Sequence, residues 1–217
     1  MADTPLTIAN RALQKLGAAP IISLDTTVDT SDRAVTMCTL YEPTLRASLQ
    51  SARWKFTQID VLLTGWECVP IHTYDCAYLL PGDLLQIEST TMADEEPWQL
   101  QSYLCGTAAT NCYTDILATN VCSPVGITYS SYVTNPRLWS PMFTEALVLE
   151  LAYQATFTLT ASQSRVDGLA RDRDIAWKKA MARDGQQQKR LSRWLSPTLL
   201  LARFSGSTRW PDRNVNL

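Results

Sequence analysis

The chain has 217 residues, of which 46% are hydrophobic and 18% charged, a composition typical of globular proteins that bury a core. A formal net charge of −2 and a pI near 5.4 exclude a broadly basic nucleic-acid-binding protein. Apolar runs stay below the roughly 18 residues of a membrane span, and the N-terminus lacks the features of a secretory signal. We therefore expect folding in a cytosol and no membrane partner.

The N-terminal segment predicts a helix with clear ends. Thr4 is a capping residue, Pro5 suits the first helical position, and Gly17 follows the last turn. An apolar stripe at helical spacing predicts the buried face: Leu6, Ala9, Leu13 and Leu16.

A second helix is expected to begin near Ser31. Proline lacks an amide hydrogen and clashes with the preceding turn, so Pro43 predicts a kink or a break. The segment closes on Trp54 and Phe56, which we expect on the same side of an extended stretch. The predicted inward-facing residues of this helix are Ala34, Met37, Cys38, Tyr41, Leu45 and Leu49.

Between residues 57 and 136 the pattern changes to short apolar runs separated by Gly, Pro, Asn and Asp. This pattern is typical of an antiparallel sheet with irregular loops. The runs that predict strands are residues 61–63, 76–80, 84–87, 116–118 and 127–133.

Helical spacing returns after Ser140 and Pro141, again a cap followed by proline. The helix over 143–159 is apolar almost all round, which indicates the centre of a bundle or of an oligomer. The next helix, over 164–183, is amphipathic, and its predicted inward-facing residues are Val166, Ala170, Trp177 and Met181.

The last segment, 186–217, combines basic residues with large apolar anchors. This segment contains six Lys and Arg residues and one acidic residue, Asp212. Its net charge is therefore +5, and that of the rest of the chain is −7. Tryptophan with arginine is characteristic of protein interfaces, so we expect a protein partner here. A DNA-binding arm stays as the alternative, because mixed cations and aromatics also bind nucleic acid.

These elements predict an α+β fold. Its helical bundle core is formed by residues 1–56 and 137–185. An antiparallel β insertion occupies residues 57–136, and an extended C-terminal docking extension occupies residues 186–217.

The residues that carry enzyme chemistry are sparse. His72 is the only histidine and no GxSxG motif accompanies it. The acids Asp94, Glu95 and Glu96 precede Pro97, as expected of a hydrated loop, although paired carboxylates also serve glycoside hydrolases. No phosphate-binding or HExxH motif occurs. We therefore expect no enzymatic activity, no catalytic residue and no cofactor.

The six cysteines contain no CxxC spacing, which disfavours a zinc site. In a reducing cytosol we expect free thiols that behave as small buried hydrophobic residues. The six are Cys38, Cys68, Cys76, Cys105, Cys112 and Cys122.

Four short motifs, in this order, resemble the tail tubular protein A family, the head-to-tail adaptors of short-tailed bacteriophages. The motifs are Leu6-Thr-Ile-Ala-Asn-Arg-Ala-Leu-Gln-Lys-Leu-Gly17 with Ile22-Ser-Leu-Asp25, Leu40-Tyr-Glu-Pro-Thr-Leu-Arg46 leading to Trp54-Lys-Phe56, Tyr78-Leu-Leu-Pro-Gly-Asp-Leu-Leu85, and the stretch 132–155 containing Phe143-Thr-Glu-Ala-Leu147. The residues that carry these structural motifs include Trp54, Phe56, Pro81 and Phe143. The resemblance covers roughly residues 1–185, and the cysteine-rich sheet segment and the C-terminal extension depart from the family pattern.

This resemblance implies a virion protein of the tail or neck, assembled in the host cytoplasm. Such a subunit forms a ring with itself, usually of about twelve copies, between the portal protein and the tail nozzle protein. Genomic DNA passes through the lumen without sequence-specific binding, and a mostly acidic body discourages DNA from adhering. The C-terminal residues expected to bind the portal are Arg190, Arg193, Trp194, Arg203, Phe204, Arg209 and Trp210.

Two alternative interpretations stay open at the level of sequence. One is a different neck or head-completion protein that shares a small helical core. The other is a virion-associated glycan hydrolase that uses Glu95 and Glu96.

Overall fold

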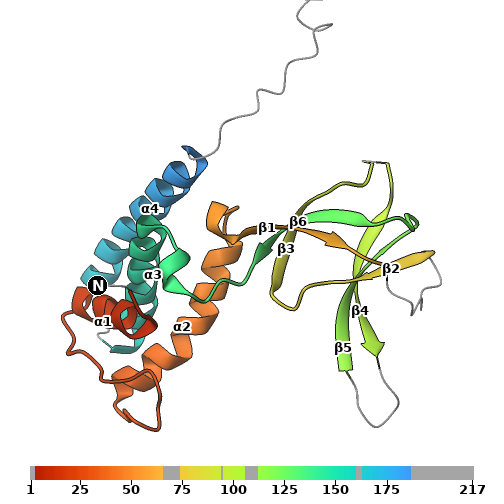
Figure 1. Ribbon diagram of the computed structural model, residues 1–217. Helices are drawn as coiled ribbons and strands as arrows, with labels where there is room; N and C mark the ends of the chain where they lie inside the picture. Colours follow the sequence, from red (N-terminus) through yellow and green to blue (C-terminus); the bar gives the residue numbers. More distant parts are fainter. Residues whose placement is uncertain (1–2, 66–73, 94, 106–111, 160–162, 187–217) are drawn as a thin grey trace, which may run out of the picture.

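The computed structural model describes residues 3–65, 74–93, 95–105, 112–159 and 163–186 (Figure 1). In this part of the chain a group of helices packs around one central helix, and two small antiparallel sheets form a second body beside it. The fold is therefore α+β. We call the two bodies the helical module and the β module.

The first helix, α1, spans Pro5–Lys15 and begins as its capping residues predict. The Thr4 hydroxyl accepts a hydrogen bond from the Thr7 amide, and Thr7 returns one from the Thr4 amide, which together form a capping box. The chain leaves α1 through Gly17, whose φ of 68° lies in the left-handed region that favours glycine.

The second helix, α2, spans Asp32–Gln50 with Ser31 as its N-cap. Of the kink or break predicted at Pro43, the break is wrong, because the helix continues through this residue. Pro43 leaves the Thr39 carbonyl without its helical partner, but both residues lie on the exposed face, where that carbonyl is open to solvent. Packing of the opposite face against the central helix holds the two halves of α2 together.

The central helix, α3, spans Pro141–Leu159 and is covered by three other helices. α1 and α2 contact it, and so does α4, which spans Gln163–Gln186. Of the two explanations for its apolar surface, the bundle is the one observed, because α3 is covered within its own chain except near its two ends, where Met142 and Phe157 are exposed. On α4, Val166, Ala180 and Asp184 are buried, whereas Met181 is 39% exposed and does not face inward as predicted.

The β module contains two three-stranded sheets instead of the single sheet that the sequence predicts. The first sheet has the order β1-β6-β3, with β1 at Gln58–Leu63, β6 at Val125–Ser131 and β3 at Leu84–Thr90. The second has the order β2-β5-β4, with β2 at Cys76–Leu79, β5 at Cys112–Thr119 and β4 at Trp98–Cys105. All pairings are antiparallel. The strand β4 was not among the predicted runs.

Side chains from both sheets form a separate core, whose buried members are Leu63, Tyr78, Leu80, Leu117, Val125, Ile127 and Tyr129. The turn between β2 and β3 connects them through Asp83. Its carboxylate accepts hydrogen bonds from the hydroxyls of Tyr129 (3.2 Å) and Ser131 (2.6 Å) on β6. Pro81 begins this turn, and its carbonyl accepts from the Leu84 amide. The Tyr78-to-Leu85 motif thus fixes β2 and β3 relative to β6.

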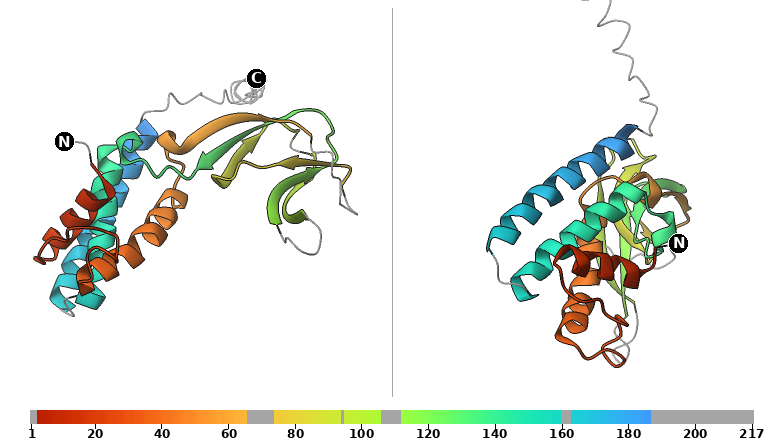
Figure 2. Two further views of the ribbon diagram at one scale, coloured as in Figure 1. Left: turned by 60° about the horizontal axis from the view of Figure 1, so that its bottom comes forward. Right: turned by 90° about the vertical axis from the view of Figure 1, so that its left-hand side faces the viewer.

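The β module projects to one side of the helical module in Figure 1 and in the left view of Figure 2, and it lies behind the helices in the right view of Figure 2. The chain enters it through the 3-10 turn Lys55–Thr57 and leaves it toward the 3-10 turn Pro136–Leu138. None of the helices in the described ranges combines the length and the hydropathy needed to cross a membrane.

Candidate functional site

The helical module is closed at the junction by an aromatic cluster. Trp54 and Phe56 bracket the first residue of a 3-10 turn, not an extended stretch as predicted, and their rings stack with centroids 6.1 Å apart. Phe143 of α3 lies edge-on to both, at 5.0 Å from Trp54 and 5.1 Å from Phe56. Trp139 and Trp177 complete the cluster at 5.5 and 5.8 Å from Phe143.

Each tryptophan of this cluster has a partner for its indole N–H. Trp54 donates to the Ser48 carbonyl at 3.0 Å, and Trp139 donates to the Val133 carbonyl at 2.9 Å. Trp177 donates to the Glu150 carboxylate at 3.0 Å. Buried aromatic rings with satisfied polar ends are structural anchors. The cluster fixes the end of α2, the start of α3 and the side of α4.

One ion pair and one hydrogen bond reinforce the junction between the modules. Arg53, just after α2, pairs with Glu88 of β3 at 2.7 Å, and the Glu88 side chain is 6% exposed. Glu88 also accepts a hydrogen bond from Ser130 of β6 at 2.8 Å. On the other side, Asp184 near the end of α4 accepts from the Lys55 amide at 3.1 Å. Burial raises the pKa of the Asp184 carboxyl, and the Lys55 contacts only partly oppose this.

A groove of about 340 Å³ runs between α2 and α4 over α3. Its floor is a polar network in which Thr44 donates to Gln154 and Gln154 donates to Glu150. Glu150 also accepts from Trp177 and lies 3.7 Å from Arg173. Glu150 is the one carboxylate of this groove, and its oxygens are engaged. The arrangement suits packing against another surface better than acid–base chemistry.

A second groove, of about 370 Å³, lies between α1, α3 and α4. Met142 and Ile175 line it and are 48% and 50% exposed. Charged residues of both signs surround these side chains, among them Lys15, Glu145, Asp172 and Lys179. Apolar residues inside a polar rim are the usual composition of a protein–protein contact. We call this site the α1/α4 groove.

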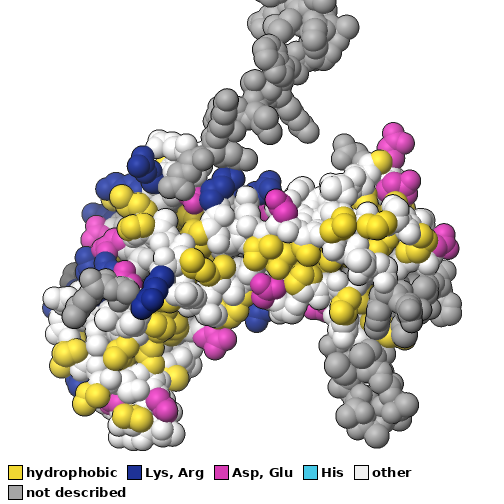
Figure 3. Space-filling model, in the orientation of Figure 1, with side chains coloured by type: hydrophobic (Ala, Val, Ile, Leu, Met, Phe, Trp, Pro, Cys, Tyr) yellow, Lys and Arg dark blue, Asp and Glu magenta, His cyan; other side chains and the backbone are white. Residues whose placement is uncertain are grey.

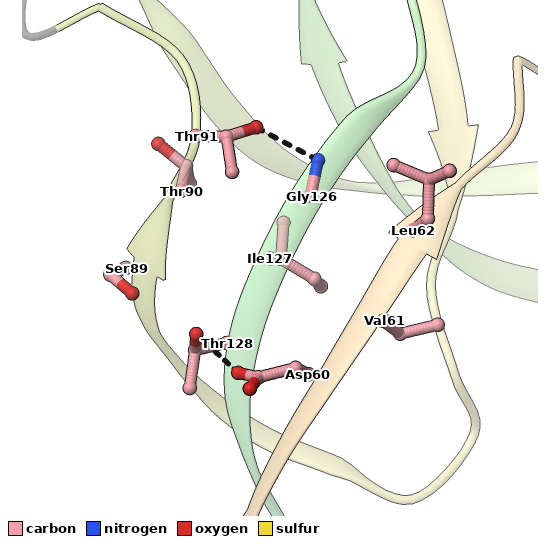
Figure 4. A pocket seen from close by; sticks show the side chains of 9 residues that line it. All are labelled: Asp60, Val61, Leu62, Ser89, Thr90, Thr91, Gly126, Ile127 and Thr128. Atoms are coloured by element: carbon pink, nitrogen blue, oxygen red, sulfur yellow. Dashed lines mark hydrogen bonds between the residues drawn. The ribbon is translucent and has the colours of Figure 1, made fainter.

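A third groove, also of about 370 Å³, crosses the first sheet and is rich in hydroxyl groups (Figure 4). Thr128 donates to Asp60 at 2.7 Å, and the Gly126 amide donates to the Thr91 hydroxyl at 3.0 Å. A Cβ on Gly126 would lie 2.8 Å from the Thr91 Cγ2, so glycine permits this close approach. Asp60 is the one titratable residue that lines the groove, so a paired acid and base are lacking there.

Charge is distributed unequally between the modules. Residues 57–136 contain nine Asp and Glu and no Lys or Arg, a net charge of −9. Figure 3 accordingly shows Lys and Arg over the helical module but none over the β module on this face. The sequence already contains this unequal distribution of charge, but counting the net charge over residues 1–185 together hides it.

The cysteine prediction needs correction. Cys76 of β2 and Cys122, before β6, form a disulfide with their Cα atoms 5.4 Å apart. The fold itself brings them together, because the Tyr78 hydroxyl, two residues after Cys76, shares its hydrogen between the carbonyls of Val121 and Ser123 on either side of Cys122. Cys38 is a free thiol but is exposed rather than buried.

Several predicted residues lie outside the described residues, namely His72, Asp94, Cys68 and the seven portal-binding candidates Arg190, Arg193, Trp194, Arg203, Phe204, Arg209 and Trp210. Glu95 and Glu96 are described and exposed. Within the described ranges, no three His, Cys, Asp or Glu side chains are grouped as a metal site would require.

Comparison with models of known protein families finds no match for this chain, and a search of curated proteins finds no significant relative.

Proposed function

We propose that this chain is a structural adaptor of the tail tubular protein A type, which joins the portal of a short-tailed bacteriophage to its tail nozzle. About twelve copies would form a closed ring through one repeated contact between neighbours. The four motifs quoted above, in their family order, support this proposal. The portal, the nozzle and further copies of the chain are its proposed partners.

The observation that carries the proposal is the division of the chain into two modules with separate cores and different charge, −9 over residues 57–136 and +2 over residues 1–56 and 137–185. The helical core and the β core share no buried member. The Arg53–Glu88 pair joins one module to the other, beside the aromatic cluster that closes the helical module. Two joined but separate modules would allow one subunit to contact a different partner with each end.

The ring contact is proposed at the α1/α4 groove. Because α3 is covered within its own chain, the central helix does not require a neighbouring subunit. Met142 and Ile175 are half exposed, and the mixed charges around them would fix the register between copies.

The β module is proposed to face the nozzle and the DNA path. Its net charge of −9 would repel the phosphate backbone, so genomic DNA would pass without sequence-specific binding. The C-terminal extension, with Trp194, Phe204 and Trp210 among its basic residues, is proposed to clamp the portal.

Co-sedimentation with purified portal rings tests the function. The full chain should sediment with the portal, and negative-stain images should show an added ring below it. A chain lacking residues 186–217 should keep its helical circular dichroism but stay in the supernatant. If the two forms bound equally, the C-terminal extension would not be the segment that binds the portal. If neither form bound, the proposed adaptor function would be refuted.

A further inference from the structure

Among the described residues, the strand β4 is an outer strand of the second sheet with nothing paired to its far side. Within the described residues β5 pairs with β2 on one side and β4 on the other, and β4 has no outer neighbour. The outer backbone groups of an edge strand are free to accept another extended segment.

Two large apolar residues of β4 lie on the face that continues the β core. Trp98 pairs with Thr119, and Leu100 pairs with Leu117. Directly opposed residues of an antiparallel pair project to the same face. Thr119 and Leu117 are fully buried, whereas Trp98 and Leu100 are 41% and 45% exposed. On this face the side chains of β5 are therefore covered, whereas those of the neighbouring β4 are left partly exposed.

Acidic residues lie at both ends of this apolar pair. Glu95 and Glu96 are exposed just before β4. Asp115 is also exposed. It pairs with Ser102 in the strand register, and its carboxylate accepts a hydrogen bond from the Ser102 hydroxyl at 2.7 Å. We call the surface formed by Glu95, Glu96, Trp98, Leu100 and Asp115 the β4 surface. An apolar centre with acidic flanks calls for an extended partner that is apolar and basic.

The chain itself contains such a partner. The segment 187–217 has six Lys and Arg against one acid, together with Trp194, Phe204 and Trp210. Its net charge of +5 complements the −9 of residues 57–136.

The position of α4 brings this segment to the β module. Asp184 bonds to Lys55, three residues before β1 begins. The chain therefore passes residue 186 beside the entry to the β module. The 31 residues that follow span up to about 100 Å when extended, far more than the length of any strand here. Attachment at this point also gives the segment a high effective concentration at the β module of its own chain.

We propose that the C-terminal segment 187–217 docks on the β4 surface of its own chain. Its aromatic residues cover Trp98 and Leu100, and its Lys and Arg residues lie against Glu95, Glu96 and Asp115. This inference concerns the free subunit and stands whether or not the same segment binds a portal. If it does, the portal must displace the segment from the β4 surface.

Limited trypsin digestion of the full chain tests the inference. No Lys or Arg lies between Lys55 and Arg137, so trypsin leaves the β module uncut while six sites report on the C-terminal segment. Cleavage at those six sites, followed by mass spectrometry, should be slow in the parent protein at low salt. It should accelerate as salt is added, after normalisation to a free reference peptide.

Variants identify the surface. Glu95→Gln, Glu96→Gln and Asp115→Asn together should speed cleavage of the segment about tenfold, the order expected for three exposed charge contacts. Leu100→Thr should speed it as well. The matched control, Asp3→Asn with Asp32→Asn and Glu42→Gln, removes three acids from the helical module and should leave the rate unchanged.

Equal cleavage rates in all variants would overturn the docking. Protection that disappears on tenfold dilution would also overturn it, because the segment would then bind a neighbouring copy. If the control variant lost protection as much as the β4 variants, the effect would depend on net charge alone, and the β4 surface would be rejected as the docking site.

Discussion

The Arg53 guanidinium lies 2.7 Å from the Glu88 carboxylate and connects the helical module to the β module. Arg53 is half exposed, whereas the Glu88 side chain is almost fully buried. The two residues are far apart in the sequence and belong to different modules. Their pairing therefore reports directly on how firmly the modules are joined.

Arg53→Met leaves the buried Glu88 charge with only the Ser130 hydroxyl as a partner. We expect a loss of about 1–3 kcal/mol in the free energy of unfolding, the usual effect of an unsatisfied buried group. Adding Glu88→Gln should restore part of the loss, because the charge is removed. Urea unfolding of the single and double variants measures this, with exposed Arg171→Met as control. A double variant no more stable than Arg53→Met would contradict the account.

Asp184 predicts a pH-dependent effect. Its pKa is raised in the folded state because burial disfavours the charged carboxylate. Stability contributed by this group is therefore greatest below the unfolded pKa and is lost as pH rises through the folded pKa. Asp184→Asn keeps an acceptor for the Lys55 amide but carries no charge. It should raise Tm at pH 7, and the gain should vanish below about pH 4.

Asp184→Leu serves as the comparison, because it removes the charge and the acceptor together. Leaving the Lys55 amide without this partner should cost about 1–3 kcal/mol at any pH. If the Asn variant were destabilised as much as the Leu variant, desolvation of the carboxylate would not be the dominant effect at this site.

The Cys76–Cys122 disulfide predicts that stability depends on the redox state. It joins residues separated by 46 positions, and a crosslink over such a loop contributes about 2–4 kcal/mol by restricting the unfolded chain. Reductant should lower Tm of the parent protein but not of Cys122→Ser. Cys38→Ser, at the exposed free thiol, should behave as the parent does. An equal response of parent and Cys122→Ser to reductant would show that the bond does not form.

The α1/α4 groove predicts which substitution prevents ring formation. Ile175→Asp places a charge among Met142 and Leu149 at the proposed contact but should leave the monomer folded, since Ile175 is half exposed. Mass photometry in the presence of portal should show no ring. Val28→Asp, equally drastic on an exposed turn away from the groove, should leave the ring intact. Loss of the ring in both variants would reject this groove as the specific contact.

Local signals in the sequence predicted the helix ends well. A capping residue followed by proline suits the first turn of a helix, whose amides lack helical partners, and so predicts where the helix begins. The structure begins α1 at Pro5, after Thr4, and α3 at Pro141, after Ser140. The Ser140 hydroxyl accepts from the Phe143 amide, as a cap should. Such signals depend on neighbours within one turn, so sequence alone suffices for them.

Features that depend on distant contacts were not predictable in the same way. Pro43 stays helical because packing against α3 outweighs its local cost. By contrast, β4 was open to prediction, since Trp98-Gln-Leu-Gln101 alternates apolar and polar residues as a half-buried strand does, although it contains no apolar run. The disulfide and the Arg53–Glu88 pair join positions that only the folded chain brings together.

The mass of the protein bound to a portal ring encoded in the same genome tests the central claim most directly. The adaptor account predicts one discrete complex, heavier than the portal by about twelve subunits of 24.3 kDa each. A portal whose mass is unchanged by an excess of the protein would contradict the account.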